Sequence, residues 1–388
     1  MKFMHLGDLH LGKSLFEFEL IEDQKYILEE ILKIIKEESV DALLIAGDVY
    51  DKSVPSEKAT LLLDWFIKTL SERKIKTFII SGNHDSDERL NFGSSLFESN
   101  GIFISSLFAG ELFKRTLEDE YGKINIFLLP FVKASTVRHF YPDETIETYD
   151  DAVRLVIDKA NIDRSERNII VSHQFVCGES NPVLSGSEGM SARTVDMQAV
   201  GTVERIGYDV FDAFDYAALG HIHGPQSVGR KEVRYSGSPL KYSLSEVNNT
   251  KSVPIITLSN KGEVDISLRE LKPMRDLRHL KGQLKNLLDT GNVCNTDDFI
   301  YATLTDEDAI SGAMGIFQQT YPNTVRIDYD NSHTQSIDNV NISEIAVNRS
   351  YDELIREFYR KMYGTDISDE EMEIMKKIAE EVGILEAD

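Results

Sequence analysis

Five short polar motifs in the first 225 residues combine aspartate, asparagine, histidine and glycine. They are Asp8-Leu9-His10, Gly47-Asp48 with Asp51, Gly82-Asn83-His84-Asp85, Ser172-His173 and Gly220-His221-Ile222-His223. Carboxylate, amide and imidazole groups suit two hard or borderline divalent cations, with one carboxylate shared between them. Thiolate, a common donor in structural zinc sites, is absent from the motifs. The candidate metal ligands are Asp8, His10, Asp48, Asn83, His173, His221 and His223.

Each motif by itself has an ordinary explanation. A lone Asp-x-His rarely binds metal, and Gly-Asn-His-Asp could be merely a turn, because Gly, Asn and Asp are the usual turn formers. A single histidine after a strand, such as His173, is more often a satisfied polar residue. Five such motifs that each follow an apolar run, and together use more than half of the nine histidines, favour a centre for two metal ions.

The apolar runs that precede the motifs predict β-strands that would position them. The first three runs are 2–6, 41–46 and 76–80, and the stretches 27–35 and 57–70 between them have the apolar period of helices. Strands that alternate with helices predict a layered α/β domain, and strand-end loops are where such a sheet gathers a ligand site. Further strands are predicted at 124–129, 169–172, 216–219, 233–235, 254–258 and 264–268.

The composition changes at Lys272-Pro273, after which a small α+β unit is predicted. Its expected elements are a helix at 277–288, a strand at 299–304, a helix at 309–320 and a strand at 324–329. Residues 331–341 are polar and indicate a linker, and two amphipathic helices follow. We therefore predict domains at 1–270 and 271–330, a linker at 331–345 and a helical module at 346–388.

Charge and composition exclude several classes of protein. The 42 Lys and Arg residues against 66 Asp and Glu residues give a net charge of −24, which argues against nucleic-acid binding through a general basic field. Bound cations would still change the local sign of the site. No apolar run approaches the roughly 18 residues of a membrane span, so a cytoplasmic location is expected. Cys177 and Cys294 form no disulfide framework or metal-binding pattern.

The motif series D-x-H, G-D-x-x-D, G-N-H-D, H and G-H-x-H resembles that of the calcineurin-like metallophosphoesterases. Longer stretches, 7–12, 82–90, 218–223 and especially Arg234-Tyr235-Ser236-Gly237-Ser238-Pro239-Leu240-Lys241-Tyr242-Ser243, resemble the nuclease subunits of bacterial DNA double-strand-break repair complexes. The resemblance is firm over residues 1–270. It implies an α/β fold, a layered calcineurin-like sandwich with a small α+β capping domain and C-terminal helices.

The same resemblance implies a metal-dependent exonuclease and endonuclease that hydrolyses phosphodiesters at DNA ends and hairpins. Its cofactors would be two divalent ions, with Mn²⁺ expected, and its partners a coiled-coil ABC-type ATPase and double-stranded or hairpin DNA. A stand-alone metallophosphatase or cyclic-nucleotide phosphodiesterase is the alternative, because it would use the same metals. A scaffold that keeps metal only for stability is a third possibility, which the intact set of ligands disfavours.

Site residues follow from the resemblance position by position. Asp8, His10, Asp48 and His223 would hold the first metal, and Asp48, Asn83, His173 and His221 the second. The two ions would activate a water for attack on the phosphorus. His84 would act as general acid on the leaving oxygen, and Asp51 could orient it through a hydrogen bond. Asp85 could equally be a turn cap or a support for the ligands.

Contacts with DNA and with other proteins are predicted from weaker signals. Arg89, Arg193 and Lys241 could line a DNA track near the motifs, although each could be an ordinary solvated charge. Apolar stripes that include Leu354, Phe358, Met375 and Ile378 predict docking of the terminal helices on a partner, with packing on the protein's own core as the alternative. The resemblance implies that this partner is the ATPase.

The resemblance also implies a homodimer within a heterotetramer that is at the nucleoid. The helix predicted at 57–70 has more apolar circumference than one buried face requires, through Leu61, Leu62, Leu63, Trp65, Phe66 and Leu70. The alternative is that this wide stripe lies between the sheet and another helix.

Overall fold

The computed structural model describes residues 1–178, 205–332, 351–363 and 366–381. The chain forms two compact units, Met1–Leu277 and Arg278–Asp388, and each is described by itself. None of the described helices is long and apolar enough to cross a membrane.

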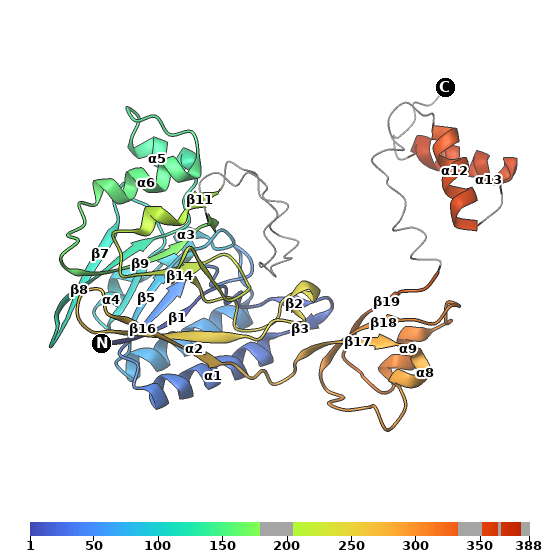
Figure 1. The fold of residues 1–388 in the computed structure, drawn as a ribbon, viewed down its shortest axis with the longest axis horizontal. Helices are drawn as coiled ribbons and strands as arrows, with labels where there is room; N and C mark the ends of the chain where they lie inside the picture. The colour runs from blue at the N-terminus through green and yellow to red at the C-terminus, as the bar shows by residue number, and fades with distance from the viewer. Residues whose placement is uncertain (179–204, 333–350, 364–365, 382–388) are drawn as a thin grey trace. The chain divides into compact units, whose positions relative to one another are not determined.

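Two six-stranded sheets make up the first unit (Figure 1). The first sheet has the order β16 (Val264–Glu270), β15 (Ser252–Leu258), β1 (Lys2–Leu6), β4 (Ala42–Ala46), β5 (Lys76–Ile80) and β6 (Ile102–Ser105). The second has the order β13 (Gln226–Val228), β14 (Arg230–Tyr235), β12 (Tyr216–Gly220), β9 (Arg167–His173), β8 (Gly122–Leu129) and β7 (Phe113–Asp119). In both sheets the central strands are parallel, so that their carboxyl ends lie along one edge.

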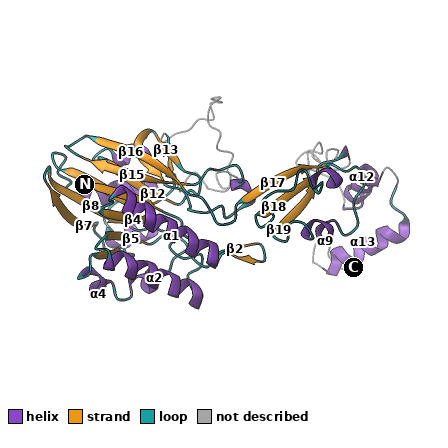
Figure 2. Ribbon diagram, turned by 90° about the horizontal axis from the view of Figure 1, so that it is seen from below, coloured by secondary structure: helices purple, strands orange, loops and turns teal. Residues whose placement is uncertain are grey.

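The sheets pack face to face around a shared core. Phe3 and Phe78 of the first sheet belong to the same buried cluster as Ile126 and Ile169 of the second. Helices α1 (Ile21–Glu38) and α2 (Glu57–Glu72) cover the outer face of the first sheet (Figures 1 and 2). Helices α5 (Ala134–Phe140) and α6 (Tyr149–Lys159) lie outside the second sheet (Figure 1). This layered arrangement confirms the predicted α/β sandwich.

Local sequence accounts for where two of the covering helices, α2 and α6, begin. Ser56 caps α2 by accepting a hydrogen bond from the Ala59 N–H at 3.2 Å. Thr148 and Asp151 form a reciprocal capping box at the start of α6. These caps position the helices against runs of buried strand residues, whose burial supplies most of the stabilisation.

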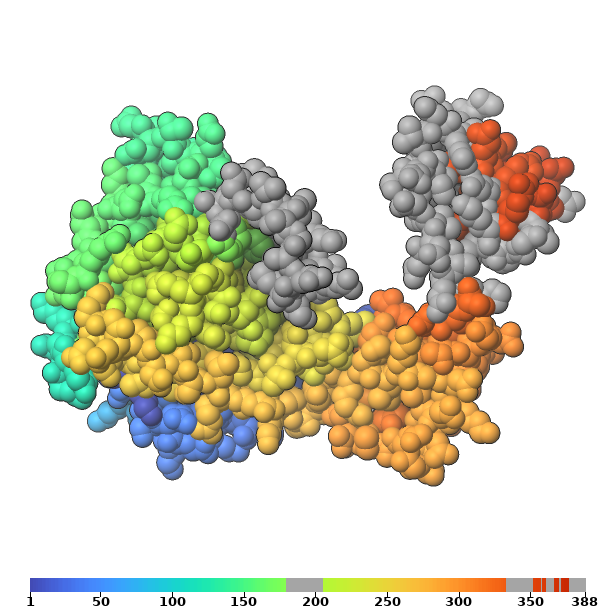
Figure 3. Space-filling model, viewed as in Figure 1, coloured from blue at the N-terminus to red at the C-terminus, as the bar shows by residue number. Residues whose placement is uncertain are grey.

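Short elements complete the first unit. The segment from 206 to 270, yellow-green to gold in Figure 3, forms much of the visible face of this unit in the space-filling view. The short elements are β2 (Ser14–Leu15), β3 (Phe18–Glu19), α3 (Asp87–Asn91), α4 (Ser94–Glu98), β10 (Val176–Cys177), β11 (Ile206–Gly207) and the 3-10 turns η2 (Tyr208–Phe211) and η3 (Leu244–Glu246).

The second unit contains a three-stranded sheet, β17 (Leu277–Gly282), β18 (Phe299–Leu304) and β19 (Thr324–Tyr329). Helix α9 (Ala313–Gln318) contributes Phe317 to a core with Ile300 and Leu304. The terminal helices are α12 (Tyr351–Tyr363) and α13 (Asp369–Glu381), joined by hydrogen bonds such as that from Tyr359 Oη to Glu371 at 2.8 Å. Most of the predicted linker, from residue 333 on, lies outside the described residues.

Two predicted helices differ from the structure. The prediction of a helix at 277–288 is wrong, because residues 277–282 form β17 and only α8 (Leu284–Leu287) is helical. The apolar residues of this short stretch fit the period of a helix as well as that of a strand. Residues 277–282 form a strand because they pair with β18. The helix expected at 309–320 is shorter, since Gly312 with φ 69° precedes the start of α9.

The apolar surface expected on α2 is mostly core. Leu62, Leu63, Phe66 and Leu70 are buried within the unit, so the prediction that they face a partner is wrong. Of the six apolar residues, only Leu61 is largely exposed, at 61%, and Trp65 is half-buried. The wide stripe therefore arises chiefly because α2 packs inside its own domain.

Candidate metal centre

Loops after five strands, β1, β4, β5, β9 and β12, converge at one edge of the sandwich. They bring Asp8, Asp48 and His173 within 4.8 Å of one another, measured between one ligand atom of each. Asp8, His10 and His223 form a second such group. Asn83 and His221 join the cluster through contacts with His173 and with each other, so all seven predicted ligands lie in it. The edge where parallel strands end thus supplies the site, as expected for an α/β sheet.

Asp48 lies at the middle of the cluster. Its Oδ2 atom is 3.5 Å from His10 Nε2 and 3.4 Å from His173 Nε2, and these histidines belong to the two different ligand sets. Its Oδ1 atom accepts a hydrogen bond from the His84 N–H at 2.9 Å. One carboxylate therefore faces both ligand sets, which is the arrangement that a bridging ligand requires.

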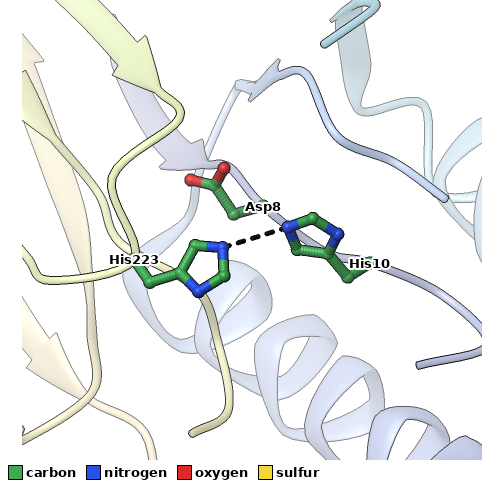
Figure 4. Close-up of side chains that lie close together, drawn as sticks. All are labelled: Asp8, His10 and His223. Carbon is green, nitrogen blue, oxygen red and sulfur yellow. Dashed lines mark hydrogen bonds between the residues drawn. The ribbon is translucent and has the colours of Figure 1, made fainter. Parts of the chain in front are cut away.

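The first ligand set has donor atoms that face one another. His10 Nε2 and His223 Nε2 are 3.1 Å apart, and Figure 4 shows both rings beside the Asp8 carboxylate. Asp8 Oδ1 accepts a hydrogen bond from the His221 N–H at 2.9 Å, whereas Oδ2 is buried without a hydrogen-bond partner among the described residues. A buried carboxylate oxygen and two converging imidazoles fit a divalent cation well.

The second ligand set surrounds Asn83. Its Oδ1 atom is 3.1 Å from His173 Nε2 and 2.9 Å from His221 Nδ1. The other ring nitrogen of His173, Nδ1, donates to the Ala46 carbonyl at 2.7 Å, which leaves Nε2 as the donor available to a metal. The residues of both sets therefore fit two divalent ions.

Backbone conformation at the site is unusual. Asp8, His10, Asp48 and His221 have φ angles of 52°, 43°, 48° and 104°, in the region that favours glycine. Such conformations cost about 1–3 kcal/mol each and concentrate at functional sites. Close packing adds a further constraint, since a Cβ atom on Gly82 would lie 2.1 Å from Asp48 Oδ1. Gly82 of the third motif is therefore needed because only a residue without a side chain lets this loop approach Asp48 so closely.

Burial and charge set the protonation of the histidines. Burial lowers the pKa of His10 to about 2 and that of His221 to about 3, so both rings are neutral. Burial also disfavours charge on His173, but the Asp48 carboxylate outweighs it and raises the pKa of His173 to about 9. The pKa of Asp48 is correspondingly held below its ordinary value, despite its burial.

Metal loading should therefore displace a proton. Below about pH 9 His173 is protonated, whereas a ligand imidazole must be neutral, so affinity for Mn²⁺ should rise with pH up to that value and then level off. We expect release of at least one proton per chain at neutral pH, because burial disfavours charge on His223 but Glu246 outweighs it and raises the pKa of this second ligand as well. Calorimetric titrations in two buffers of different ionisation enthalpy would measure it. Affinity that is constant between pH 6.5 and 9 would contradict His173 as a ligand.

His84 and Asp51 meet, but not through the expected atoms. His84 Nδ1 lies 3.1 Å from the main-chain carbonyl oxygen of Asp51, so the ring can donate there and keep Nε2 free. The Asp51 side chain instead bonds Lys13 Nζ at 2.6 Å. The expected hydrogen bond between Asp51 and His84 is therefore present, but it involves the main-chain carbonyl of Asp51 and not its carboxylate. His84 itself is exposed beside His10, with ring centroids 4.9 Å apart.

Supports around the ligands were only partly foreseen. Asp85 accepts hydrogen bonds from the N–H groups of Val49, Tyr50 and Gly82 at 2.8–3.1 Å, which ties the second and third loops together. Burial raises the pKa of Asp85 to about 6. It is a turn-stabilising and ligand-supporting residue at once.

Two supports of the first loop were missed. Gln24 Nε2 donates to the His10 carbonyl at 2.7 Å, and Tyr242 Oη donates to the Leu9 carbonyl at 2.6 Å. Gln24 lies on α1, 14 residues after His10, whereas Tyr242 is 233 residues from Leu9. The only signal was that Tyr242 belongs to the specific run 234–243.

The predicted DNA contacts lie in different surroundings. Arg89 is exposed on α3. Lys241 is 12% exposed and bonds Asp276 and the Leu277 carbonyl, so its charge is already paired. Arg193 lies outside the described residues.

The residues predicted to bind the ATPase lie on the terminal helices. Phe358 is 57% exposed, whereas Leu354 and Met375 are half-buried. The side chain of Ile378 lies outside the described residues.

Comparisons with known proteins agree with this geometry. The model of the calcineurin-like phosphoesterase family matches residues 1–225, and that of the Type 5 capsule protein repressor C-terminal domain matches residues 273–363. The chain is 33% identical to the SbcD subunit of the nuclease SbcCD from Staphylococcus epidermidis, over 97% of this chain and 98% of the relative.

Two solved structures are more distant. A dimetal phosphatase from Danio rerio is 11% identical, with a TM-score of 0.42 over 71% of this chain and 98% of its own. A novel archaeal phosphodiesterase is 12% identical, with a TM-score of 0.32 over 69% of this chain and 100% of its own. Likeness at these scores has no bearing on the function of the chain.

Proposed function

The chain belongs to the calcineurin-like phosphoesterases, in the family of the SbcD subunit of the nuclease SbcCD, and on this premise we propose that it is a metal-dependent DNA nuclease. One observation carries the proposal. Asp48 lies between two complete ligand sets in a chain that matches the SbcD relative over 97% of its length. Hydrolysis of DNA phosphodiesters at ends and hairpins, in repair and recombination, is the activity that these features support.

Two divalent ions, with Mn²⁺ expected, would be held by the proposed ligands. Asp8, His10 and His223 would hold the first, Asn83, His173 and His221 the second, and Asp48 both. When bound, the ions supply an activated water and neutralise charge on the phosphate. The residues of the chain contribute orientation, because His173 Nδ1 and the strained loops fix the donor atoms before metal binds.

His84 is proposed as the general acid. Its main-chain N–H holds Asp48, and its Nδ1 atom faces the Asp51 carbonyl. Nε2 would then carry no internal contact and could donate a proton to the leaving oxygen of DNA. Because Nδ1 donates to the Asp51 carbonyl, His84 with a second proton on Nε2 would be a cation. It would become neutral on donating the Nε2 proton and would take up a proton from solvent before the next cleavage.

The parts of the chain would have distinct roles. We assign the nuclease to residues 1–270, end recognition to a capping domain at 271–330, and ATPase binding to a module at 346–388 that follows a linker at 331–345. Arg89 is the DNA contact best supported, since it is exposed, whereas Lys241 is engaged with Asp276. Activity on DNA would take place in the cytoplasm, at the nucleoid.

A direct assay tests the function. The purified chain with Mn²⁺ should degrade labelled duplex and hairpin DNA faster than it hydrolyses a small phosphomonoester or a cyclic nucleotide. A preference for the small esters would favour the stand-alone phosphatase or phosphodiesterase. Inactivity on all substrates, with two ions bound, would favour a scaffold.

An SbcC-type ATPase is the proposed partner, bound through α12 and α13. Ending the chain at residue 341 should leave a folded, metal-binding nuclease that no longer co-purifies with the ATPase. In the full chain, Phe358→Glu should weaken the complex at least about tenfold, because a charge would enter an apolar contact. Leu268→Glu is the matched control, since Leu268 is also half-exposed but lies on β16. Unfolding of the shortened chain would mean that the helices belong to its core.

A homodimer is proposed through the exposed residues near α2. Leu61 is 61% exposed, and Phe92 and Leu96 in the α3–α4 region are 84% and 74% exposed. The C-terminal end of α2 approaches the segment that follows α4, with Ser71 Oγ donating to the Asn100 carbonyl at 3.5 Å. Light scattering at micromolar concentration should give a dimer that Leu61→Glu dissociates and the neighbouring Thr60→Glu leaves intact. A dimer untouched by Leu61→Glu would reject this surface.

A further inference from the structure

His223, a proposed ligand of the first metal, has a buried carboxylate behind it. Its Nδ1 atom is 3.1 Å from Glu246 Oε1, while its Nε2 atom faces His10. Glu246 is only 2% exposed and ends the 3-10 turn η3. The carboxylate therefore lies on the side of the ring opposite to the candidate metal position.

Glu246 is itself held in place by several donors. Oε1 accepts hydrogen bonds from Ser243 Oγ at 3.0 Å and from the Tyr242 N–H at 3.3 Å. Oε2 accepts from Ser238 Oγ at 3.2 Å and pairs with the ammonium of Lys251. Because these donors fix both oxygens, the position of Oε1 beside His223 is determined before any metal binds.

Lys251 completes the arrangement from the other side. It is 5% exposed, and its ammonium also donates to the His223 carbonyl at 2.9 Å and to Ser238 Oγ at 2.8 Å. The main chain and the ring of His223 are thus held by the same buried ion pair. Among the candidate ligand histidines, His173 has a backbone carbonyl behind it, and His223 has this carboxylate.

We infer that Glu246 is a positioning residue that keeps the proton of His223 on Nδ1 and directs Nε2 to the first metal. A carboxylate behind a ligand histidine fixes its tautomer and orientation and makes it a stronger donor, and its loss typically costs 10- to 100-fold in metal affinity. The inference rests on the proposed metal centre. It assigns a role to a residue that touches neither the metal position nor the substrate.

A purely structural explanation must be separated from this role. Glu246 could be present only to neutralise buried Lys251, because an unpaired buried charge is strongly destabilising. The two oxygens divide these tasks, since Oε2 faces Lys251 and Oε1 faces His223. Removing the charges of Glu246 and Lys251 together therefore distinguishes positioning of His223 from mere neutralisation of Lys251.

The test is a titration of the full chain with Mn²⁺. Binding is monitored by calorimetry and by the electron spin resonance signal of coupled Mn²⁺ pairs. The unaltered chain should bind two ions. Glu246→Gln should weaken one of them about 10- to 100-fold and leave the other unchanged, so that the coupled-pair signal appears only at higher Mn²⁺. Glu232→Gln is the matched control, because Glu232 also pairs with basic residues, Arg230 and Lys231, and it should bind both ions normally.

The double variant Glu246→Gln/Lys251→Met decides between the explanations. It leaves no orphaned cation, and weak binding of one ion should persist. Normal binding in the double variant, or in a folded Glu246→Gln, would overturn the inference. If those variants do not fold, Glu246→Asp decides, since it keeps the charge beside Lys251 but is too short to hold His223, and normal binding there would likewise overturn it. Fewer than two ions in the unaltered chain would instead reject the metal centre itself.

Discussion

Replacing Asp48 by alanine should remove both metal ions and the nuclease activity together. Its Oδ2 atom lies within 3.5 Å of a histidine from each ligand set. Without the Asp48 carboxylate, no anion lies between His10 and His173 to offset the repulsion between the two bound metal ions. Two metal ions stabilise the transition state of phosphodiester hydrolysis by several kcal/mol. The rate of DNA hydrolysis should therefore fall by roughly 10³-fold or more.

Metal content after gel filtration and the rate of duplex degradation would measure this result. Asp64→Ala is a suitable control, because Asp64 is exposed on α2 and lies in no group of candidate ligands within the described residues. It should keep two ions and full activity. An Asp48→Ala protein that still holds two ions would reject the bridging assignment.

Replacing His84 by alanine should have a different outcome, with both ions retained and DNA hydrolysis lowered by about 10²- to 10⁴-fold. His84 is exposed and contacts the Asp51 carbonyl through Nδ1, while Asp48 is held by its main-chain N–H, which alanine also provides. The ligand geometry should therefore survive. The surface residue His139, replaced by alanine, serves as the control.

The choice of substrate makes this prediction more specific. A general acid assists only leaving groups that need a proton, so a p-nitrophenyl phosphodiester, whose phenolate leaves unaided, should be cleaved almost normally by His84→Ala. The defect should appear with DNA, whose leaving group is an alkoxide. An equal loss on both substrates, or loss of bound metal, would contradict the role.

Much of the candidate site could be predicted without the structure because its signals are local. Each motif joins a buried strand to a turn, and both features depend on neighbouring residues: apolar runs such as 76–80 form the strand, and Gly, Asn and Asp form the turn after it. The bounds of β1, β5 and β19 agree with prediction for the same reason. Where the local signal was ambiguous, as at residues 277–282, pairing with a neighbouring strand decided.

The sequence by itself determined which residue types come after each strand, and hence the chemistry of the centre. Only the tertiary structure decided which atoms meet. Asp8 and the His221 N–H are 213 positions apart, and Glu246, which contacts the His223 ring, is 23 positions from it. The same holds for Asp51, whose carbonyl faces His84, and for Leu63 and Phe66, which the sheet buries. Short-range periodicity cannot specify such contacts, because they depend on how the two sheets pack and on which buried polar groups then find partners.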